Sequence, residues 1–84
     1  MSESVTVTVY TREQCHLCEK AIRTIRSVAE SVPELVTVDA IDVDRDSELR
    51  AEYGNRVPYI FVDDRPAFKF RVDAEELRSM LAER

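Results

Sequence analysis

The chain has 84 residues and a formal net charge of −5 at pH 7, with 44% hydrophobic and 35% charged residues. This length predicts one domain, residues 1–84, and the composition is typical of a folded chain rather than a disordered one. The acidic charge argues against nucleic acid or an anionic membrane surface as the partner.

The first elements are a strand and a long helix. Residues 5–10, VTVTVY, alternate valine with threonine and tyrosine, and this β-branched pattern of period two predicts a strand. After a polar connection at residues 11–14, apolar residues recur at helical spacing from Cys18 to Val32. Since Pro33 cannot continue a helix, we expect an amphipathic helix that ends before it.

The middle of the chain combines a β-rich run with a short helix. Residues 35–43 predict a second strand, and residues 47–53 fit a helix that is followed by Gly54 at its C′ position. The aspartates within residues 39–46 lack the glycine and the final glutamate of an EF-hand. Helix caps and a solvated loop therefore explain them better than a cation site.

The last third predicts a hairpin and a terminal helix. A strand over residues 57–62 and an alternating run over residues 67–72 are separated by turn residues, so they should pair antiparallel. Asp73 fits an N-cap, with Glu76 three residues further on as in a capping box. The apolar side of this last helix consists of Leu77, Met80 and Leu81.

The elements follow the order β-α-β-α-β-β-α. A strand–helix–strand unit forms a right-handed crossover between parallel strands, whereas the last two strands form an antiparallel hairpin. The sequence therefore predicts an α/β fold in which a four-stranded mixed sheet carries three helices on its two faces.

Cys15 and Cys18, the only cysteines, lie at the start of the first predicted helix. Residues three apart share one face of a helix, with Cβ atoms roughly 5–6 Å apart, so a disulfide needs little backbone movement. The unpaired N–H groups at a helix N-terminus favour a thiolate over a thiol. Cys15 is nearer the exposed end, while Cys18 continues the apolar side. This arrangement suits thiol–disulfide exchange.

The first residues of the chain and the length of its apolar runs bear on the cellular location of the protein. The first residues, MSES, lack the basic segment and apolar stretch of a secretory signal, and no apolar run reaches the ~20 residues of a membrane span. We therefore expect a cytoplasmic monomer that contacts no membrane. In that compartment a CxxC pair is more often redox-active or metal-binding than structural.

Three features together resemble the thioredoxin fold in its short glutaredoxin form. They are the order of elements, the CxxC at the first strand–helix junction, and the Val57-Pro58 pair that opens the third strand. The run YTREQCHLC at residues 10–18 is similar to the glutaredoxin opening, in which Tyr-Ser/Thr-Lys leads to Cys-Pro-Tyr-Cys. The resemblance covers nearly the whole chain and is greatest to short glutaredoxin-like proteins with CxLC.

The resemblance implies a thiol–disulfide oxidoreductase in which Cys15 is the nucleophile and Cys18 the resolving thiol. Cys15 would attack a protein or small-molecule disulfide, and Cys18 would then release the reduced substrate from the mixed disulfide. Val57-Pro58 matches the family's Val-Pro, whose peptide bond is cis and faces the active cysteine. Arg12 stands where glutaredoxins place a lysine, and its charge would favour the thiolate.

Two further residues are candidates for the same site. Arg56, beside the Val-Pro pair, would add to the positive field around the reactive sulfur. His16, the only histidine, has two interpretations. Its protonated ring would stabilise a neighbouring thiolate, or it is a surface residue of the first helical turn.

The region before the last helix departs from the resemblance. Glutathione-binding glutaredoxins carry a Gly-Gly pair and an aspartate there, whereas this chain reads Phe70-Arg71-Val72-Asp73. Side chains therefore occupy positions at which the close approach of a ligand favours glycine. Asp73 is a candidate substrate contact that capping also explains. No cofactor is expected, and the electron donor is either glutathione, as a co-substrate, or a flavoprotein disulfide reductase.

Two other classes of function stay open. A structural zinc site needs four ligands, usually from two pairs, and Cys15 with Cys18 supplies one pair. A metal site would therefore need a second chain, either for zinc or for a shared iron–sulfur cluster. The other class is a thioredoxin-fold binding module that has lost the chemistry, and the two intact cysteines count against it.

Overall fold

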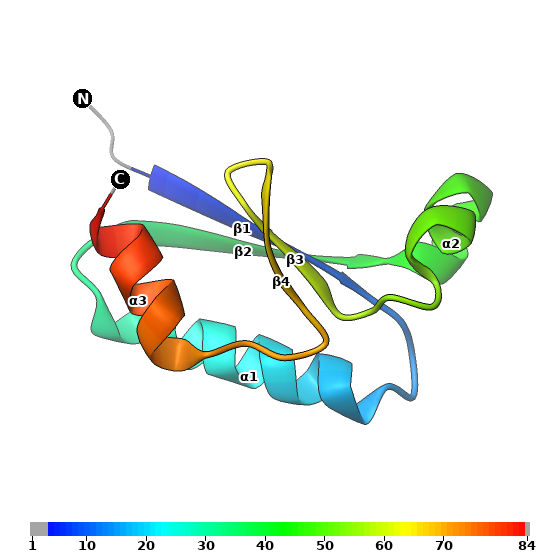
Figure 1. The fold of residues 1–84 in the computed structure, drawn as a ribbon, viewed down its shortest axis with the longest axis horizontal. Coiled ribbons are helices and arrows are strands. Elements are labelled where there is room, and N and C mark those ends of the chain that lie inside the picture. Colours follow the sequence, from blue (N-terminus) through cyan, green and yellow to red (C-terminus); the bar gives the residue numbers. More distant parts are fainter. Residues whose placement is uncertain (1–3, 84) are drawn as a thin grey trace.

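The structure, a computed structural model, describes residues 4–83 and contains one four-stranded sheet with the strand order β2-β1-β3-β4 (Figure 1). β1 and β2 are parallel, while β1 with β3 and β3 with β4 are antiparallel. These pairings confirm the predicted mixed sheet and the predicted order of elements. The elements are β1 (Ser4–Thr11), α1 (His16–Ser31), β2 (Leu35–Asp42), the 3-10 helix η1 (Val43–Arg45), α2 (Ser47–Tyr53), β3 (Tyr59–Val62), β4 (Arg65–Lys69) and α3 (Ala74–Ala82).

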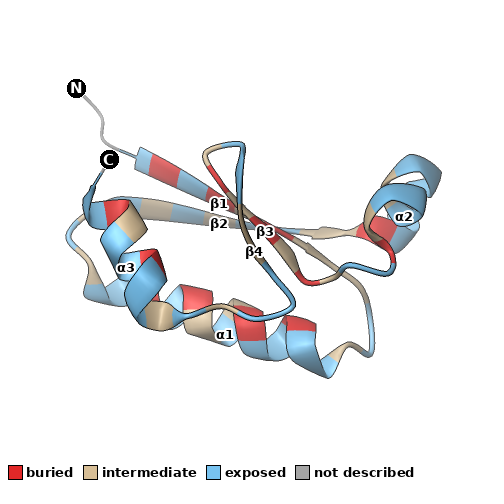
Figure 2. Cartoon of the chain, viewed as in Figure 1, coloured by how far each residue is buried: buried red, intermediate tan, exposed pale blue. Residues whose placement is uncertain are grey.

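The side chains of β1 alternate between the two faces of the sheet. Val5, Val7 and Val9 are fully buried, whereas Thr6 and Thr8 belong to the opposite face. α1 and α3 cover the valine face, and Figure 2 shows buried positions where these helices meet the strands. The core between them consists of Val5, Val7, Val9, Ala21, Ile25, Val28, Ile60, Val62, Leu77 and Leu81.

Proline and aspartate set the ends of several helices. α1 ends at Ser31 because Val32, directly before Pro33, has an extended backbone with φ −106° and ψ 153°. The side chains of Asp42, Asp46 and Asp73 accept backbone N–H groups at the starts of η1, α2 and α3 respectively. The interpretation of the acidic loop residues as helix caps is therefore confirmed for these aspartates.

The second face of the sheet carries an aromatic cluster at one end. α2 lies beyond the end of β2 (Figure 1). It reaches this face through Tyr53, whose ring stacks on that of Tyr10 at a centroid distance of 4.4 Å. Tyr59 and Phe61 of β3 complete the cluster. Burial raises the pKa of Tyr53 above its ordinary value, and the neighbouring Tyr10 adds to this effect. The helices were expected on both faces of the sheet, and they cover them unequally. α1 and α3 both lie on the valine face, whereas α2 reaches the other face through Tyr53.

Gly54 differs from the prediction in position and in backbone conformation. It is the C-cap of α2 rather than the C′ residue, and its φ of −53° and ψ of −34° are right-handed helical values. A Cβ atom at Gly54 would lie 2.5 Å from the carbonyl oxygen of Arg50. Close approach of backbone, rather than a left-handed conformation, therefore explains the glycine.

Candidate active site

Cys15 and Cys18 form a disulfide at the start of α1, with their Cα atoms 5.2 Å apart. This separation lies within the roughly 4.4–6.8 Å that a disulfide requires. Cys15 is the N-cap residue, with an extended backbone, and its Sγ accepts the backbone N–H of Cys18 at 3.1 Å. The chain therefore forms the bond that the spacing of the two cysteines predicts.

The two sulfurs differ in their access to solvent. Cys15 is half-buried, because it lies where the loop from β1 enters the helix. Cys18 is 1% exposed and belongs to the side of α1 that packs into the protein, as its place in the apolar pattern predicts. Cys15 is therefore the more accessible of the two sulfur atoms.

The Val57-Pro58 pair precedes β3 at the end of the sheet from which β1 leads to Cys15. Tyr10 of β1 pairs with Tyr59 of β3, so the chain just before β3 lies beside the start of the loop that leads to Cys15. The Val57-Pro58 peptide bond is cis, as the resemblance implies, and Pro58 is buried. β3 itself begins at Tyr59, later than the predicted strand over residues 57–62.

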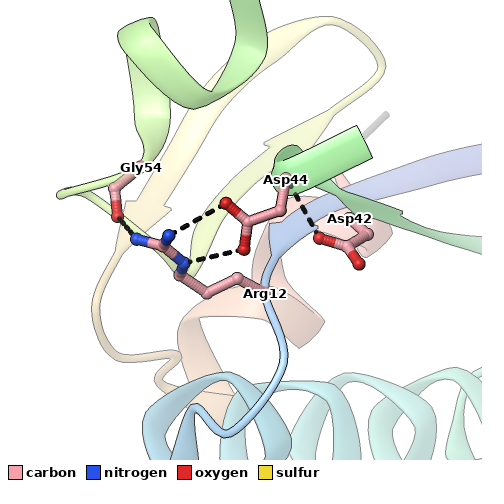
Figure 3. Close-up of polar contacts among 4 residues, drawn as sticks. All are labelled: Arg12, Asp42, Asp44 and Gly54. Carbon is pink, nitrogen blue, oxygen red and sulfur yellow. Dashed lines mark hydrogen bonds and ion pairs between the residues drawn. The ribbon is translucent and has the colours of Figure 1, made fainter. Parts of the chain in front are cut away.

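Arg12 joins the loop before Cys15 to two other segments (Figure 3). Its guanidinium donates two hydrogen bonds to the carboxylate of Asp44 in η1, at 3.1 and 2.9 Å, and one to the carbonyl oxygen of Gly54 at 2.9 Å. The bridge holds the loop against η1 and the end of α2. Arg12 thus has a structural contact that the sequence did not reveal, and its influence on a thiolate stays a prediction.

Arg12→Ala is expected to lower the free energy of unfolding by about 1 kcal/mol. The side chains of Arg12 and Asp44 are each 35% exposed, so solvent screens their attraction, but the bidentate geometry and the bond to Gly54 are lost together. Arg12→Lys should recover part of the difference, since lysine keeps the charge without the planar fork. Urea denaturation of the oxidised protein measures both changes.

The matched control for this prediction is Arg26→Ala, which removes an exposed arginine from α1. It is expected to change stability by less than about 0.5 kcal/mol. Equal effects of Arg12→Ala and Arg26→Ala would contradict the bridge.

Arg56 and His16 lie on the surface. The Arg56 guanidinium is 3.7 Å from the carboxylate of Glu52, one helical turn earlier, and its side chain is more than half exposed. His16 is the first residue of α1 and is exposed. Both are near Pro58 or Cys15 in sequence, and their roles at the sulfur stay predictions.

Asp73 is the N-cap of α3. Its Oδ1 accepts the backbone N–H groups of Glu75 and Glu76 at 3.0 and 3.1 Å. The predicted capping role is confirmed, and the hydrogen bonds to the helix N-terminus already use Oδ1 of Asp73. A substrate contact by Asp73 stays a prediction.

Phe70 lies in a turn that the sequence pattern does not predict. Alternation predicted a strand over residues 67–72, but β4 ends at Lys69 because Phe70 has a left-handed backbone with φ 72°. The N–H of Arg71 donates to the carbonyl of Lys69 at 2.8 Å, which closes a γ-turn around Phe70. The N–H of Phe70 donates to the carbonyl of Pro58 at 2.7 Å. This conformation costs about 1–3 kcal/mol for a residue other than glycine.

Leu17 and Phe70 line one groove of about 480 Å³ between α1 and the turn before α3. Leu17 lies between the two cysteines in the sequence, although neither cysteine lines the groove. Its charged lining comes from Lys20, Arg71, Asp73 and Glu76. The only hint of this groove in the sequence is the replacement of the Gly-Gly pair by Phe70 and Arg71.

Neither a metal centre nor a membrane span is found in the described part of the chain. Among residues 4–83, no three His, Cys, Asp or Glu side chains gather in a group that could hold a metal ion. Within the same range, no helix is both long enough and apolar enough to cross a membrane.

Comparison with known proteins identifies relatives that match most of the chain. Residues 6–82 match the family described as Glutaredoxin-like domain (DUF836). The chain is also 30% identical over 79 residues to "Glutaredoxin-like protein YDR286C homolog" from Dictyostelium discoideum, which covers 89% of this chain and 73% of that protein.

Solved structures share the architecture. The X-ray structure of protein XcR50 from X. campestris has a TM-score of 0.70 and 29% identity, covering 93% of this chain and 97% of that one. Protein Ne2328 from Nitrosomonas europaea has a TM-score of 0.77 and 27% identity, covering 95% and 94%. Chloroplastic thioredoxin z has a TM-score of 0.76 at 19% identity, covering 96% and 78%, and so supports the fold alone. With a thioredoxin-like fold and a CxxC disulfide at the start of α1, the chain belongs to the glutaredoxin-like domain family.

Proposed function

We propose that the protein is a thiol–disulfide oxidoreductase that cycles between the Cys15–Cys18 disulfide and a dithiol. The observation that carries this proposal is the disulfide between a half-buried N-cap cysteine and a buried one. The family and the thioredoxin-like fold support a redox role for such a pair. The protein would act in the cytoplasm as an electron carrier for protein or small-molecule disulfides.

The chemistry transfers two electrons in two exchange steps. In the reduced protein, the Cys15 thiolate attacks one sulfur of the substrate disulfide, so a mixed disulfide forms and the other substrate sulfur leaves as a thiolate. The Cys18 sulfur, as thiolate, then attacks Sγ of Cys15, and the second substrate thiolate leaves. The two substrate thiolates take up protons, the substrate is reduced and the Cys15–Cys18 dithiol is oxidised.

The surroundings of Cys15 support its role as the attacking sulfur. Its Sγ already accepts the N–H of Cys18, and the N-terminal end of α1 favours negative charge at this position. Cys18 lies too deep for a substrate but is within reach of Cys15. We propose that Val57 and Pro58 contact the substrate beside this sulfur.

The electron donor forms a separate part of the proposal. Either glutathione, used as a co-substrate, or a flavoprotein disulfide reductase would return the two electrons to Cys15 and Cys18. The proposed function holds with either donor, because both reduce the disulfide through thiol exchange.

The test is a single-turnover reaction between the fully reduced protein and a disulfide-bonded peptide. We expect one peptide disulfide to be reduced for each protein molecule, with the Cys15–Cys18 disulfide as the protein product by peptide mass mapping. Multiple turnovers with glutathione plus glutathione reductase, or with a flavoprotein thioredoxin reductase, then identify the donor. A reduced protein that leaves the peptide oxidised would contradict the proposal.

A further inference from the structure

The turn before α3 places an aromatic ring on the same groove as Leu17, the residue before Cys18. Phe70 is at the centre of the γ-turn, and its backbone N–H donates a hydrogen bond to the carbonyl oxygen of buried Pro58. A glycine would adopt the positive φ without strain, whereas phenylalanine does so at a cost. Because strained backbone is found most often at functional sites, the side chain of Phe70 is a candidate for a functional contact.

The ring of Phe70 is one of two exposed apolar side chains on the same groove. Within residues 4–83, three large hydrophobic side chains are exposed: Leu17 at 49%, Leu35 at 69% and Phe70 at 40%. Leu17 and Phe70 both line this groove, whereas Leu35 lies at the start of β2. A pair of exposed apolar side chains that share one groove, one of them between the two cysteines in the sequence, is typical of a binding surface.

Three basic side chains lie near this apolar pair, although the chain as a whole is acidic. The only two lysines of the chain are Lys20, which lines the groove, and Lys69, whose Nζ is 5.5 Å from the centre of the Phe70 ring. Arg71 also lines the groove, and within residues 4–83 neither Lys20 nor Arg71 forms an ion pair. These two cations are therefore available to an acidic group of a ligand.

Carboxylates of the protein itself limit where that acidic group can lie. Asp73 and Glu76 line the α3 side of the groove, and Asp73 already accepts the N–H groups at the start of α3. A ligand carboxylate would be repelled there, so Lys20 and Arg71 are its partners. The groove thus combines an apolar contact at Leu17 and Phe70 with a cationic one.

We propose that this groove binds an extended segment of a protein substrate next to its reactive cysteine, and that it favours a large apolar residue followed or preceded by an acidic one. A small disulfide such as that of glutathione has no large apolar side chain to fill the space between Leu17 and Phe70. This proposal rests on the proposed exchange reaction at Cys15, for which it names the substrate class. Phe70 is then a specificity-determining residue.

The experiment compares two disulfide-bonded peptides of equal length as substrates of the reduced protein. One carries leucine and glutamate beside its cysteine, and the other carries serine and lysine at the same positions. We expect kcat/KM to be about tenfold higher for the leucine–glutamate peptide, equivalent to about 1.4 kcal/mol of recognition. Phe70→Gly, which also removes the backbone strain, should lower the ratio of the two kcat/KM values, because it removes the aromatic contact and leaves Lys20 and Arg71 for the glutamate.

The control is Leu35→Ser, which removes an exposed leucine elsewhere on the sheet and should keep the wild-type ratio. Lys20→Glu should also lower the ratio, because it replaces the cation that is proposed to contact the glutamate of the peptide with a carboxylate. Equal rates with the two peptides, or a ratio that Phe70→Gly leaves unchanged, would overturn the proposed groove while leaving the exchange reaction standing. If the wild-type protein reduces neither peptide, the proposed function itself fails.

Discussion

Cys15→Ser is expected to reduce turnover of a disulfide peptide to the uncatalysed rate. A serine hydroxyl at the N-cap can keep the hydrogen bond from the N–H of Cys18, so the start of α1 should stay folded. It cannot form a mixed disulfide, and the remaining Cys18 is 1% exposed and out of reach of a substrate. Circular dichroism would check the fold, and release of peptide thiol would measure the rate.

Cys18→Ser should have a different result at the same site. Cys15 can still attack the substrate, but no second sulfur resolves the product, so a mixed disulfide with Cys15 accumulates. Intact-mass spectrometry should detect one peptide bound per protein, released by a reducing agent. Turnover by Cys15→Ser equal to that of the wild type would contradict the assignment of the nucleophile.

Ile25→Ala is expected to lower the free energy of unfolding by about 2–5 kcal/mol. Ile25 of α1 is fully buried in the core between the sheet and the helices α1 and α3, and the substitution removes apolar surface and leaves a cavity. This loss is a large part of the roughly 5–15 kcal/mol by which domains are stable. Guanidinium denaturation of the oxidised wild-type and variant proteins would measure it.

The neighbouring exposed residue provides the control for the core prediction. Arg26→Ala shortens a solvent-exposed side chain on the same helix and should change stability by less than about 0.5 kcal/mol. A loss below about 1 kcal/mol for Ile25→Ala would show that α1 does not pack on the sheet as described.

Local patterns made most of the fold predictable from the sequence. The alternation of valine and threonine in β1 identifies its buried face, since Val5, Val7 and Val9 pack under α1 and α3. Asp73 caps α3 through N–H groups two and three residues away, a contact that sequence spacing alone describes. The disulfide also spans a single helical turn. Contacts of this kind depend on near neighbours.

The parts of the site that escaped prediction depend on distant residues or on ambiguous patterns. Arg12 contacts Asp44 and Gly54, which lie 32 and 42 residues further along the chain, and no local sequence pattern predicts such contacts. Phe70 continues the alternation of a strand, and a phenylalanine gives no local indication of the left-handed γ-turn that forms. The hydrogen bond between Phe70 and Pro58, which joins two separate segments, accompanies the turn.

The most direct test of the account is the rate of iodoacetamide alkylation of the reduced protein as a function of pH, resolved for Cys15 and Cys18 by mass spectrometry. We predict that Cys15 reacts with an apparent pKa well below the ordinary value of about 8.5, while Cys18 stays slow. The reason is the position of Cys15 at the N-terminal end of α1 and the burial of Cys18. Equal rates that titrate near 8.5 for both cysteines, or protection of both until a chelator is added, would contradict an activated nucleophile.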